Sequence, residues 1–350
     1  MKKNEKILII CIVITLVISL VGCNDAVSEL HFNGKLQEIV LPADTHIISD
    51  LEVDGDGNLF IATMKHDTGT SGSIANIWRL EENKEWDMVF EKKILPDESK
   101  DSEALISLID DKAIICDYNC DPKDPFSGIY DLYRVDDISN NNITKVFAGV
   151  DHYSLSQFCG MKVNGVYSVD SVTGSLVKLD FVNSRIDEIK EPTDVVQLQS
   201  SKNLGYIIYR QKYEITEEEK AELDPMSDDP SKYARGIIYN LDNGTITESS
   251  LFDQVAIRFF EKWNKGGLNT YNSVPLCYPC IDSKKEAYYL AHNDGLYRID
   301  ENGETLIYYD NSWDREGVQL NKMVVTSSGD IYLCVYFDDF SNVKIFKIYQ

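Results

Sequence analysis

Oxygen-bearing side chains recur at alternate positions in one segment of this 350-residue chain. Asp117, Asn119 and Asp121 alternate, and another acid, Asp124, follows them. Carboxylate and amide oxygens at such positions are the ligands that a hard cation such as calcium prefers. An EF-hand loop is not complete here, because Pro122 stands where that loop has its glycine and Gly128 where it has its bidentate glutamate. We retain the segment as a candidate calcium site, with an ordinary acidic loop as the alternative.

A second alternating set, Asp54, Asp56 and Asn58, lies between two apolar runs. Asp-Gly and Gly-Asn steps are typical of tight turns, because these residues adopt the required backbone conformations at little cost. Backbone geometry therefore accounts for this set without a metal. We predict no resident cofactor other than the possible calcium ion.

Few side chains of this chain are candidates for catalysis. Polar groups near expected strand starts could line a channel, and they are His46, Asp50, Asp151, His152, Asn272 and Asn321. No spacing motif connects them. The sequence has no nucleophile elbow, no HExxH pair and no phosphate-binding glycine loop. A binding function is therefore favoured over an enzymatic one.

Six cysteines remain once Cys11 and Cys23 are assigned to the N-terminal segment. The Cys277-Tyr278-Pro279-Cys280 run invites a redox interpretation, but that chemistry usually places the first cysteine at a helix N-terminus, whereas this run is strand-like. Most of the six fall in apolar runs, which favours buried thiols. A disulfide between Cys116 and Cys120, or within the CxxC run, stays open.

The first 23 residues form a targeting segment rather than part of the fold. Three lysines precede an apolar run from Ile7 to Val21, and the run ends at Leu20-Val21-Gly22-Cys23. A basic region, a short apolar region and small residues before a cleavage point are typical of an export signal. The segment resembles a bacterial lipoprotein signal, which implies a lipidated Cys23 and attachment to the extracytoplasmic side of the cell membrane. An uncleaved signal anchor is the alternative.

The charge of the chain excludes several classes of partner. The formal net charge of −24 becomes −26 without the signal, because Lys2, Lys3, Lys6 and Glu5 leave together. Such a surface repels nucleic acid and anionic lipid headgroups. We therefore expect contact with the membrane only through the lipid.

A four-residue sequence motif, called the repeated phrase below, occurs six times and indicates which strands position the candidate polar side chains. It consists of a large apolar residue, a basic or polar one, an apolar one and usually an acid, as in Tyr133-Arg134-Val135-Asp136 and Tyr297-Arg298-Ile299-Asp300. The average spacing of about 54 residues is typical of stacked or circular arrays. Strand-turn-strand patterns before each copy and a polar strand after it predict a four-stranded antiparallel meander.

Six such units predict an all-β fold, a six-bladed β-propeller spanning residues 35–350, with a tether at 24–34. The last unit lacks a fourth strand, and the run Lys35–Leu41 can supply it from the other end of the chain. Closure of this kind protects strand edges. A β-sandwich or two smaller β domains is the alternative architecture.

One of the six predicted units also resembles a known family of propellers. The run Val53–Ala62 is similar to the strand-turn-strand motif of gluconolactonase-like and NHL-repeat propellers, and the other units match it only loosely. The resemblance implies the propeller fold. It also implies the alternative function, a metal-dependent hydrolase or lyase whose acids and amides hold the ion at the channel.

Long loops gather at one end of the predicted meanders. They include the acidic insertion 211–235 and the connectors 91–103, 251–273 and 310–319, together with 64–73 and 117–127. Insertions on one face of a repeat array usually mark the binding face. We expect this face to bind a protein, peptide or glycan at the cell surface. Candidate contact residues are Tyr118, Phe126, Tyr153, Trp263, Tyr271, Trp313, Tyr336 and Asp338, because aromatic anchors dominate binding hot spots.

Overall fold

The computed structural model describes most of the chain beyond its N-terminal segment. The described residues are 35–43, 45, 47–66, 73–82, 84–94, 101–109, 112–121, 124–138, 142–151, 155–162, 164–170, 175–189, 195–201, 206–212, 234–255, 258, 276–281, 287–292, 295–313, 317–338 and 342–349. The chain divides into two compact units, Met1–Asn33 and Gly34–Gln350, and all described residues belong to the second. Cys23 and the predicted signal lie outside them. Within the described part, no helix is long and apolar enough to cross a membrane.

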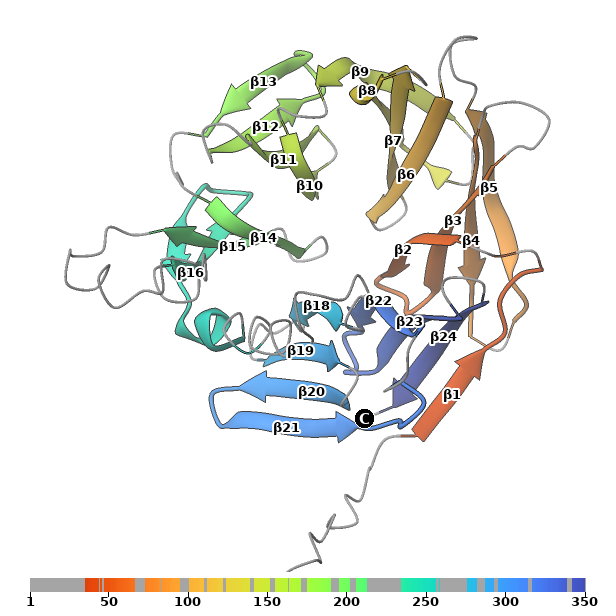
Figure 1. Cartoon of the computed structure of the whole chain (residues 1–350), viewed down its shortest axis with the longest axis vertical. Coiled ribbons are helices and arrows are strands. Elements are labelled where there is room, and N and C mark those ends of the chain that lie inside the picture. Colours follow the sequence, from red (N-terminus) through yellow and green to blue (C-terminus); the bar gives the residue numbers. More distant parts are fainter. Residues whose placement is uncertain are drawn as a thin grey trace, which may run out of the picture. The chain divides into compact units, whose positions relative to one another are not determined.

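The described strands form six four-stranded antiparallel sheets (Figure 1). Sheet I contains β2 (Ile47–Val53), β3 (Leu59–His66), β4 (Ser73–Leu80) and β5 (Asp87–Ile94). Sheet II contains β6 (Asp101–Ile109), β7 (Lys112–Asp121), β8 (Asp124–Val135) and β9 (Ile143–Asp151). Sheet III contains β10 (Leu155–Lys162), β11 (Gly165–Asp170), β12 (Leu176–Asp180) and β13 (Arg185–Glu188). The predicted antiparallel four-stranded units are therefore confirmed for these segments.

The remaining three sheets follow the same plan with one exception. Sheet IV contains β14 (Val195–Ser201), β15 (Tyr206–Lys212), β16 (Ala234–Asn240) and β17 (Ile246–Glu248). Sheet V contains β18 (Leu276–Ile281), β19 (Ala287–His292), β20 (Gly295–Asp300) and β21 (Gly303–Tyr308). Sheet VI contains β22 (Gln319–Val325), β23 (Ile331–Phe337), β24 (Asn342–Tyr349) and, as its fourth strand, β1 (Lys35–Ile39).

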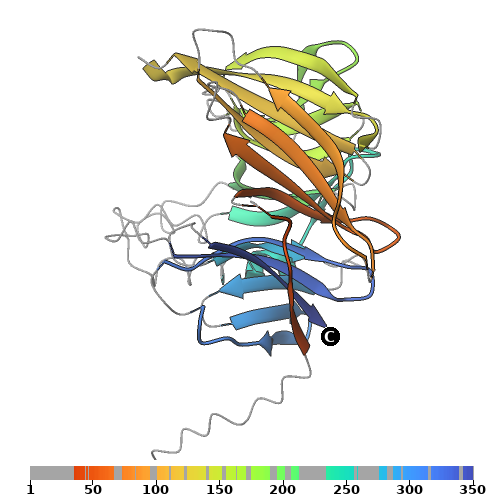
Figure 2. The same ribbon diagram turned by 90° about the vertical axis from the view of Figure 1, so that its right-hand side faces the viewer.

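Strand β1 pairs antiparallel with β24, from Lys35 opposite Tyr349 to Ile39 opposite Ile345. Figures 1 and 2 both show these two strands side by side. Lys344 Nζ forms an ion pair with Glu38 Oε2 at 2.9 Å, which adds a side-chain contact to the ladder. The indole of Trp86, from the turn between β4 and β5, donates to the carbonyl of Val40 at 2.6 Å. Sheet I therefore also holds the end of β1.

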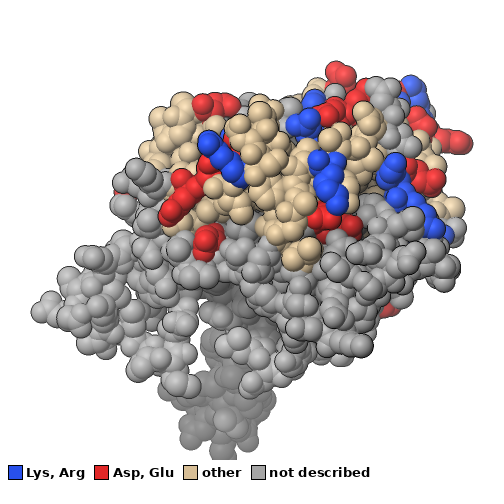
Figure 3. All heavy atoms as spheres, turned by 90° about the horizontal axis from the view of Figure 1, so that it is seen from above, with Lys and Arg blue, Asp and Glu red and all other residues tan. Residues whose placement is uncertain are grey.

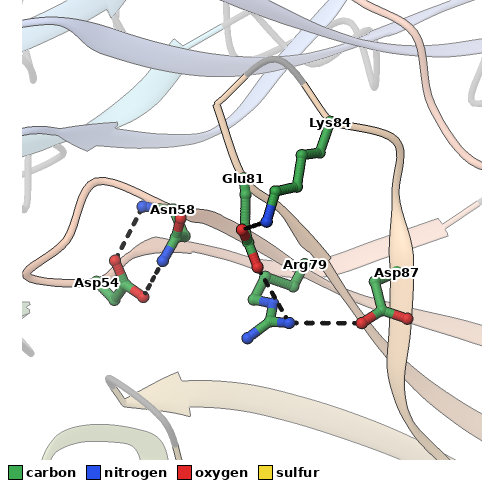
Figure 4. A network of polar contacts seen from close by, with 6 residues as sticks. All are labelled: Asp54, Asn58, Arg79, Glu81, Lys84 and Asp87. Atoms are coloured by element: carbon green, nitrogen blue, oxygen red, sulfur yellow. Dashed lines mark hydrogen bonds and ion pairs between the residues drawn. The ribbon is translucent and has the colours of Figure 1, made fainter.

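The repeated phrase occupies the third strand of each sheet, and in sheets I, II and V its basic residue forms an ion pair with its acid. Residues two apart in a strand share a face, so the basic residue and the following acid meet. Arg134 Nε lies 2.6 Å from Asp136 Oδ1, and Arg298 Nη1 lies 2.8 Å from Asp300 Oδ2. In sheet I, Arg79 contacts both Glu81 and Asp87, and Lys84 also contacts Glu81 (Figure 4).

The acid of the phrase also shapes the turn that follows. The Asp180 carboxylate accepts hydrogen bonds from the amides of Val182 and Asn183, at 2.9 and 3.2 Å, and from the Asn183 side chain. The Asn183 side-chain bond lowers the pKa of Asp180. The Asp300 carboxylate accepts from the Asn302 amide in the same way. Aspartate commonly closes turns through such bonds, so the phrase serves the scaffold.

The turn at Asp54 also follows this rule. Its carboxylate accepts from the amides of Asp56 and Asn58 and from the Asn58 side chain (Figure 4). The backbone explanation predicted for this set is therefore consistent with the structure.

Six clusters of buried apolar residues hold the sheets together, and each lies between two of them. They join sheet I with II, II with III, III with IV, IV with V, V with VI, and VI with I. In the last of these, Leu51 and Ile61 of sheet I pack against Tyr332 and Ile345 of sheet VI. Every sheet is thus packed on two neighbours.

The connector after β17 begins with a short helical segment at 250–255. The Ser249 hydroxyl accepts from the Phe252 amide at 3.1 Å and caps the segment. Phe252 and Val255 are buried between sheets IV and V. The chain passes so close to β16 that a Cβ on Gly236 would lie 2.7 Å from the Ser249 carbonyl. These described residues fill the space between sheets IV and V, whereas Trp263, further along the same connector, lies outside the described residues.

Tyr288 provides a test of this packing. Its ring stacks on Phe252 at 5.8 Å, and burial raises the pKa of Tyr288 to about 12. An unfolded tyrosine ionises near pH 10, so above that pH the unfolded state releases a proton that the folded state keeps, and stability falls as pH rises. Between pH 9 and 11, wild type should lose about 1 kcal/mol more than Tyr288→Phe in urea unfolding. Tyr309→Phe, at an exposed residue, is the control; equal losses in wild type and Tyr288→Phe would contradict the prediction.

Candidate functional site

The segment predicted as a calcium loop is mostly a β-hairpin. Strand β7 continues through Asp121, β8 starts at Asp124, and Asp121 pairs with Asp124. The predicted loop 117–127 is therefore wrong, because the ladder to β6 extends as far as Cys120. The Asp117 side chain is only 2% exposed.

Among the described side chains, no group of three or more His, Cys, Asp or Glu residues could hold a metal ion. The side chains of Asn119, Asp121 and Asp124 lie outside that description. Calcium at this hairpin stays a prediction from the sequence.

The predicted contact residues separate into four groups. Trp313 and Tyr336 are buried, at 0% and 3% exposure, and both belong to core clusters. Tyr118 and Phe126 lie in β7 and β8, with side chains outside the description. Asp338 is exposed after β23 and has a positive φ of 53°. The others lie outside the described residues: Tyr153, Trp263 and Tyr271.

Irregularities recur near the start of the first strand in five of the sheets. The pairing shifts between Ile48 and Asp50 in β2, and between Leu320 and Lys322 in β22. It also shifts between Cys277 and Cys280 in β18, and in β10 and β14. Bulges re-aim side chains and are common next to functional sites. We define the bulge cluster as the residues between the shifted pairs of β2, β18 and β22: Ser49, Tyr278, Pro279 and Asn321.

Three buried hydrogen bonds fix the residues on either side of Ser49. The Tyr336 hydroxyl, from sheet VI, accepts from the Ile48 amide at 2.8 Å and donates to the Ile48 carbonyl at 3.3 Å. Burial raises the pKa of Tyr336 further above its usual value, which keeps the hydroxyl proton in place. The Asp50 carboxylate accepts from the Leu108 amide of sheet II at 2.8 Å. The bulge is therefore held from both neighbouring sheets.

The Ser49 hydroxyl oxygen is buried and has no hydrogen-bond partner among the described residues. A buried polar group of this kind costs free energy unless something satisfies it. Because its flanking residues are fixed, Ser49 is a rigidly placed donor and acceptor. This is the property expected of a ligand-contacting group.

Asn321 occupies the equivalent position in the neighbouring first strand. Residues of β22 contact both β2 and β18, so the three bulged strands are neighbours. The bulged residue is third in β2 and in β22, which begin at Ile47 and Gln319. The cluster thus brings a hydroxyl and an amide to one end of adjacent strands. Two of the predicted channel residues, Asp50 and Asn321, lie at these bulges. Three others lie outside the described residues: His46, His152 and Asn272. The last, Asp151, lies in β9, but its side chain is not described.

The connections at this end of the sheets include the longest in the chain. Turns after first and third strands are short, as at 54–58, 181–184 and 301–302. At the opposite end the chain runs through 213–233, 249–275 and 309–318 between strands. The connectors 249–275 and 309–318 lead directly into β18 and β22, the strands that carry Tyr278, Pro279 and Asn321. The unequal loop lengths predicted from the sequence are present, with three exceptions. The predicted loop 117–127 is a hairpin, and of the predicted loops 64–73 and 91–103 only 67–72 and 95–100 connect the strands.

The third and fourth strands of sheet II, and the fourth strand of sheet III, carry oppositely charged side chains that form ion pairs. Lys145 and Asp131 form an ion pair at 2.7 Å, and Arg185 and Asp187 form one at 2.8 Å. Figure 3 shows basic and acidic side chains interleaved on the side that faces upward in Figure 1. The described part of that side therefore has no continuous patch of one sign to attract a charged partner.

No protein-family model and no curated protein matches the sequence. Several solved structures are similar in fold. They include virginiamycin B lyase from Staphylococcus aureus, with 11% identity, a TM-score of 0.41 and coverage of 91% of this chain and 100% of that one. An α-L-arabinanase from Penicillium chrysogenum has 10% identity, a TM-score of 0.43 and coverage of 86% and 92%. The β-propeller domain of the trilobed protease from Pyrococcus furiosus has 11% identity, a TM-score of 0.41 and coverage of 89% and 82%. Likenesses this weak say nothing about what this chain binds.

Proposed function

We propose that the six sheets are the blades of a closed six-bladed β-propeller. The support is the order of the core clusters, each of which joins consecutive sheets, with sheet VI packed on sheet I. Contacts between sheets involve the first strands above all, as in β2 with β22 and β18 with β22. In this arrangement the first strands surround a central channel, and the bulge cluster lies at its loop-bearing end.

We infer that the chain is a lipid-anchored extracytoplasmic binding protein that recognises a protein, peptide or glycan with this end of the propeller. The N-terminal segment, which resembles a lipoprotein signal, supports the anchor. The observation that carries the binding role is the fixed Ser49 bulge, whose buried hydroxyl has no partner among the described residues. A ligand with hydrogen-bonding groups can satisfy it, and the long loops supply additional contact area.

Binding can be tested with the full-length protein in detergent, screened against glycan and peptide arrays. The double variant Ser49→Ala, Asn321→Ala should weaken binding of any ligand found by about tenfold or more, as loss of one or two rigid hydrogen bonds predicts. Ser328→Ala changes an exposed turn at the opposite end of sheet VI and should leave affinity unchanged. Equal weakening by both variants, or by neither, would contradict the proposal.

The same preparation distinguishes the alternative function. A stoichiometric divalent ion in the purified protein, lost together with hydrolase or lyase activity when a chelator is added, would favour the metal-dependent enzyme. Charge reversal in the acidic insertion 211–235 provides an independent test of the loops. It should change ligand capture if this end binds, and leave capture unchanged if the insertion is only a solvated loop.

A further inference from the structure

One tyrosine of sheet VI holds the backbone beside the Ser49 bulge. The Tyr336 hydroxyl accepts from the Ile48 amide at 2.8 Å and donates to the Ile48 carbonyl at 3.3 Å. Both side chains are buried, and both belong to the cluster between sheets VI and I. A hydrogen bond weakens steeply when its distance or angle changes. The position of Tyr336 therefore sets the position of the residue that precedes Ser49.

A buried row connects Tyr336 with the outermost strand of its sheet. Ile39 of β1 pairs with Ile345 of β24, and Ile345 pairs with Cys334 of β23. Cys334 and Tyr336 are two apart in β23, so they share one face of the sheet. All four residues pack in the cluster between sheets VI and I, together with Ile48. The last residue of β1 and the tyrosine that holds Ile48 thus belong to one packed surface.

Strand β1 is the element of this surface that can exist in two states, paired and unpaired. It is five residues long and comes from the opposite end of the chain to β24, so only non-covalent contacts hold it in sheet VI. Among its described side chains, only Ile39 is buried. Packed cores are not continuously deformable, so the loss of a strand changes such a surface in one step. Coupling between separate parts of a protein requires a two-state element of this kind.

We propose that the pairing of β1 regulates the Ser49 site, with Tyr336 as the positioning residue that connects them; this rests on the proposed binding function. While β1 is paired, Ile39 supports β24 and β23, and the Tyr336 hydroxyl holds Ile48. When β1 leaves, the row loses Ile39, β23 shifts, and Ser49 is no longer rigidly placed. Such a coupling is reciprocal, so a ligand bound at Ser49 would stabilise the pairing of β1 by the same factor.

The first test measures hydrogen exchange of the Ile48 amide by mass spectrometry, in the full-length protein in detergent and without a ligand. Tyr336→Phe keeps the ring but removes the hydroxyl, so the Ile48 amide should exchange about tenfold faster, as the loss of one hydrogen bond predicts. Tyr332→Phe is the matched control, because Tyr332 lies in the same strand and cluster but contacts Lys347 of its own sheet. It should leave Ile48 exchange unchanged. Equal acceleration by both variants, or none by Tyr336→Phe, would overturn the role of Tyr336.

Truncation of a β1 side chain tests the coupling itself. Ile39→Ala should speed exchange of the Ile48 amide by about tenfold more than that of the Leu179 amide in sheet III, because Leu179 packs in a different cluster. In the Tyr336→Phe background the same truncation should give no such excess, since the link is already removed. Ile39→Val gives a second measurement if the alanine variant folds poorly by near-UV circular dichroism.

The outcomes separate this regulation from the binding role. Equal acceleration at Ile48 and Leu179 would mean that β1 acts on global stability alone, and would overturn the coupling. An excess at Ile48 that persists in the Tyr336→Phe background would overturn it as well. Failure of the array screen would contradict the binding role but leave these exchange rates as expected, whereas absent coupling with ligand binding intact would remove only the regulation.

Discussion

Ile39→Asp should lower the free energy of unfolding by about 3 to 5 kcal/mol, whereas Val40→Asp should change it by less than about 0.5 kcal/mol. The two residues are adjacent in sequence, but Ile39 is 9% exposed and Val40 is 83% exposed. Ile39 lies in the cluster between sheets VI and I, where a carboxylate would be buried without a described cation beside it. Urea unfolding followed by far-UV circular dichroism measures both effects.

This pair of variants tests whether β1 is an integral part of sheet VI. Both introduce the same charge into the same segment, so an effect of the added charge alone would appear in both. Equal destabilisation, or none in Ile39→Asp, would show that β1 does not contribute to the folded core as described.

Asp50→Ala should destabilise the protein by about 2 to 3 kcal/mol, and Asp50→Asn should recover most of the loss. The Asp50 carboxylate accepts from the Leu108 amide, which belongs to a fully buried residue. Hydrogen bonds to charged groups contribute about 1.5 to 3 kcal/mol, and a buried donor left without an acceptor costs about as much. Asparagine keeps an acceptor oxygen at the same position.

Hydrogen exchange gives a local measurement of the same change. The Leu108 amide should exchange faster in Asp50→Ala than in wild type, because its acceptor is gone. Asp56→Ala, in the exposed turn between β2 and β3, is the matched control and should leave both stability and Leu108 exchange unchanged. If the control lost as much stability as Asp50→Ala, general charge effects rather than the Leu108 bond would be responsible.

The regular parts of the fold could be predicted from the sequence because their causes are local. Arg134 and Asp136 meet because they are two apart in one strand, and Asp180 closes its turn through amides two and three residues away. The repeated phrase therefore identified the third strand of every sheet. The same phrase, counted from the last unit, indicated that a strand was missing there, and β1 occupies that position.

The candidate site could not be predicted in this way, because a bulge is a property of two paired strands. Nothing in Ile48-Ser49-Asp50 marks Ser49 as the extra residue until β3 is aligned beside it. The fixing groups, Tyr336 and Leu108, are remote in sequence. The sequence gives one weak indication of the site, because Asp50 and Asn321 are polar residues near the expected starts of strands.

Two errors in the prediction have related physical causes. The hairpin at Asp121 and Asp124 contains Pro122 and several acids, which are typical of loops, yet pairing to β6 and β8 outweighs these local preferences. Trp313 was predicted as a surface anchor, but it fills the space between sheets V and VI. Aromatic residues supply large area to cores and to interfaces alike, so residue type alone does not separate the two uses.

The pairing of β1 with β24 has a consequence for how the protein is made. Five sheets consist of strands that follow one another directly, so each can form as soon as its own segment is available. Sheet VI cannot, because Lys35 must wait for Tyr349, at the far end of the chain. Bringing such distant residues together is the slow step in folding. Until then the edge of β24 is an unpaired template for another chain, so we expect this protein to be most prone to aggregate before β1 has paired.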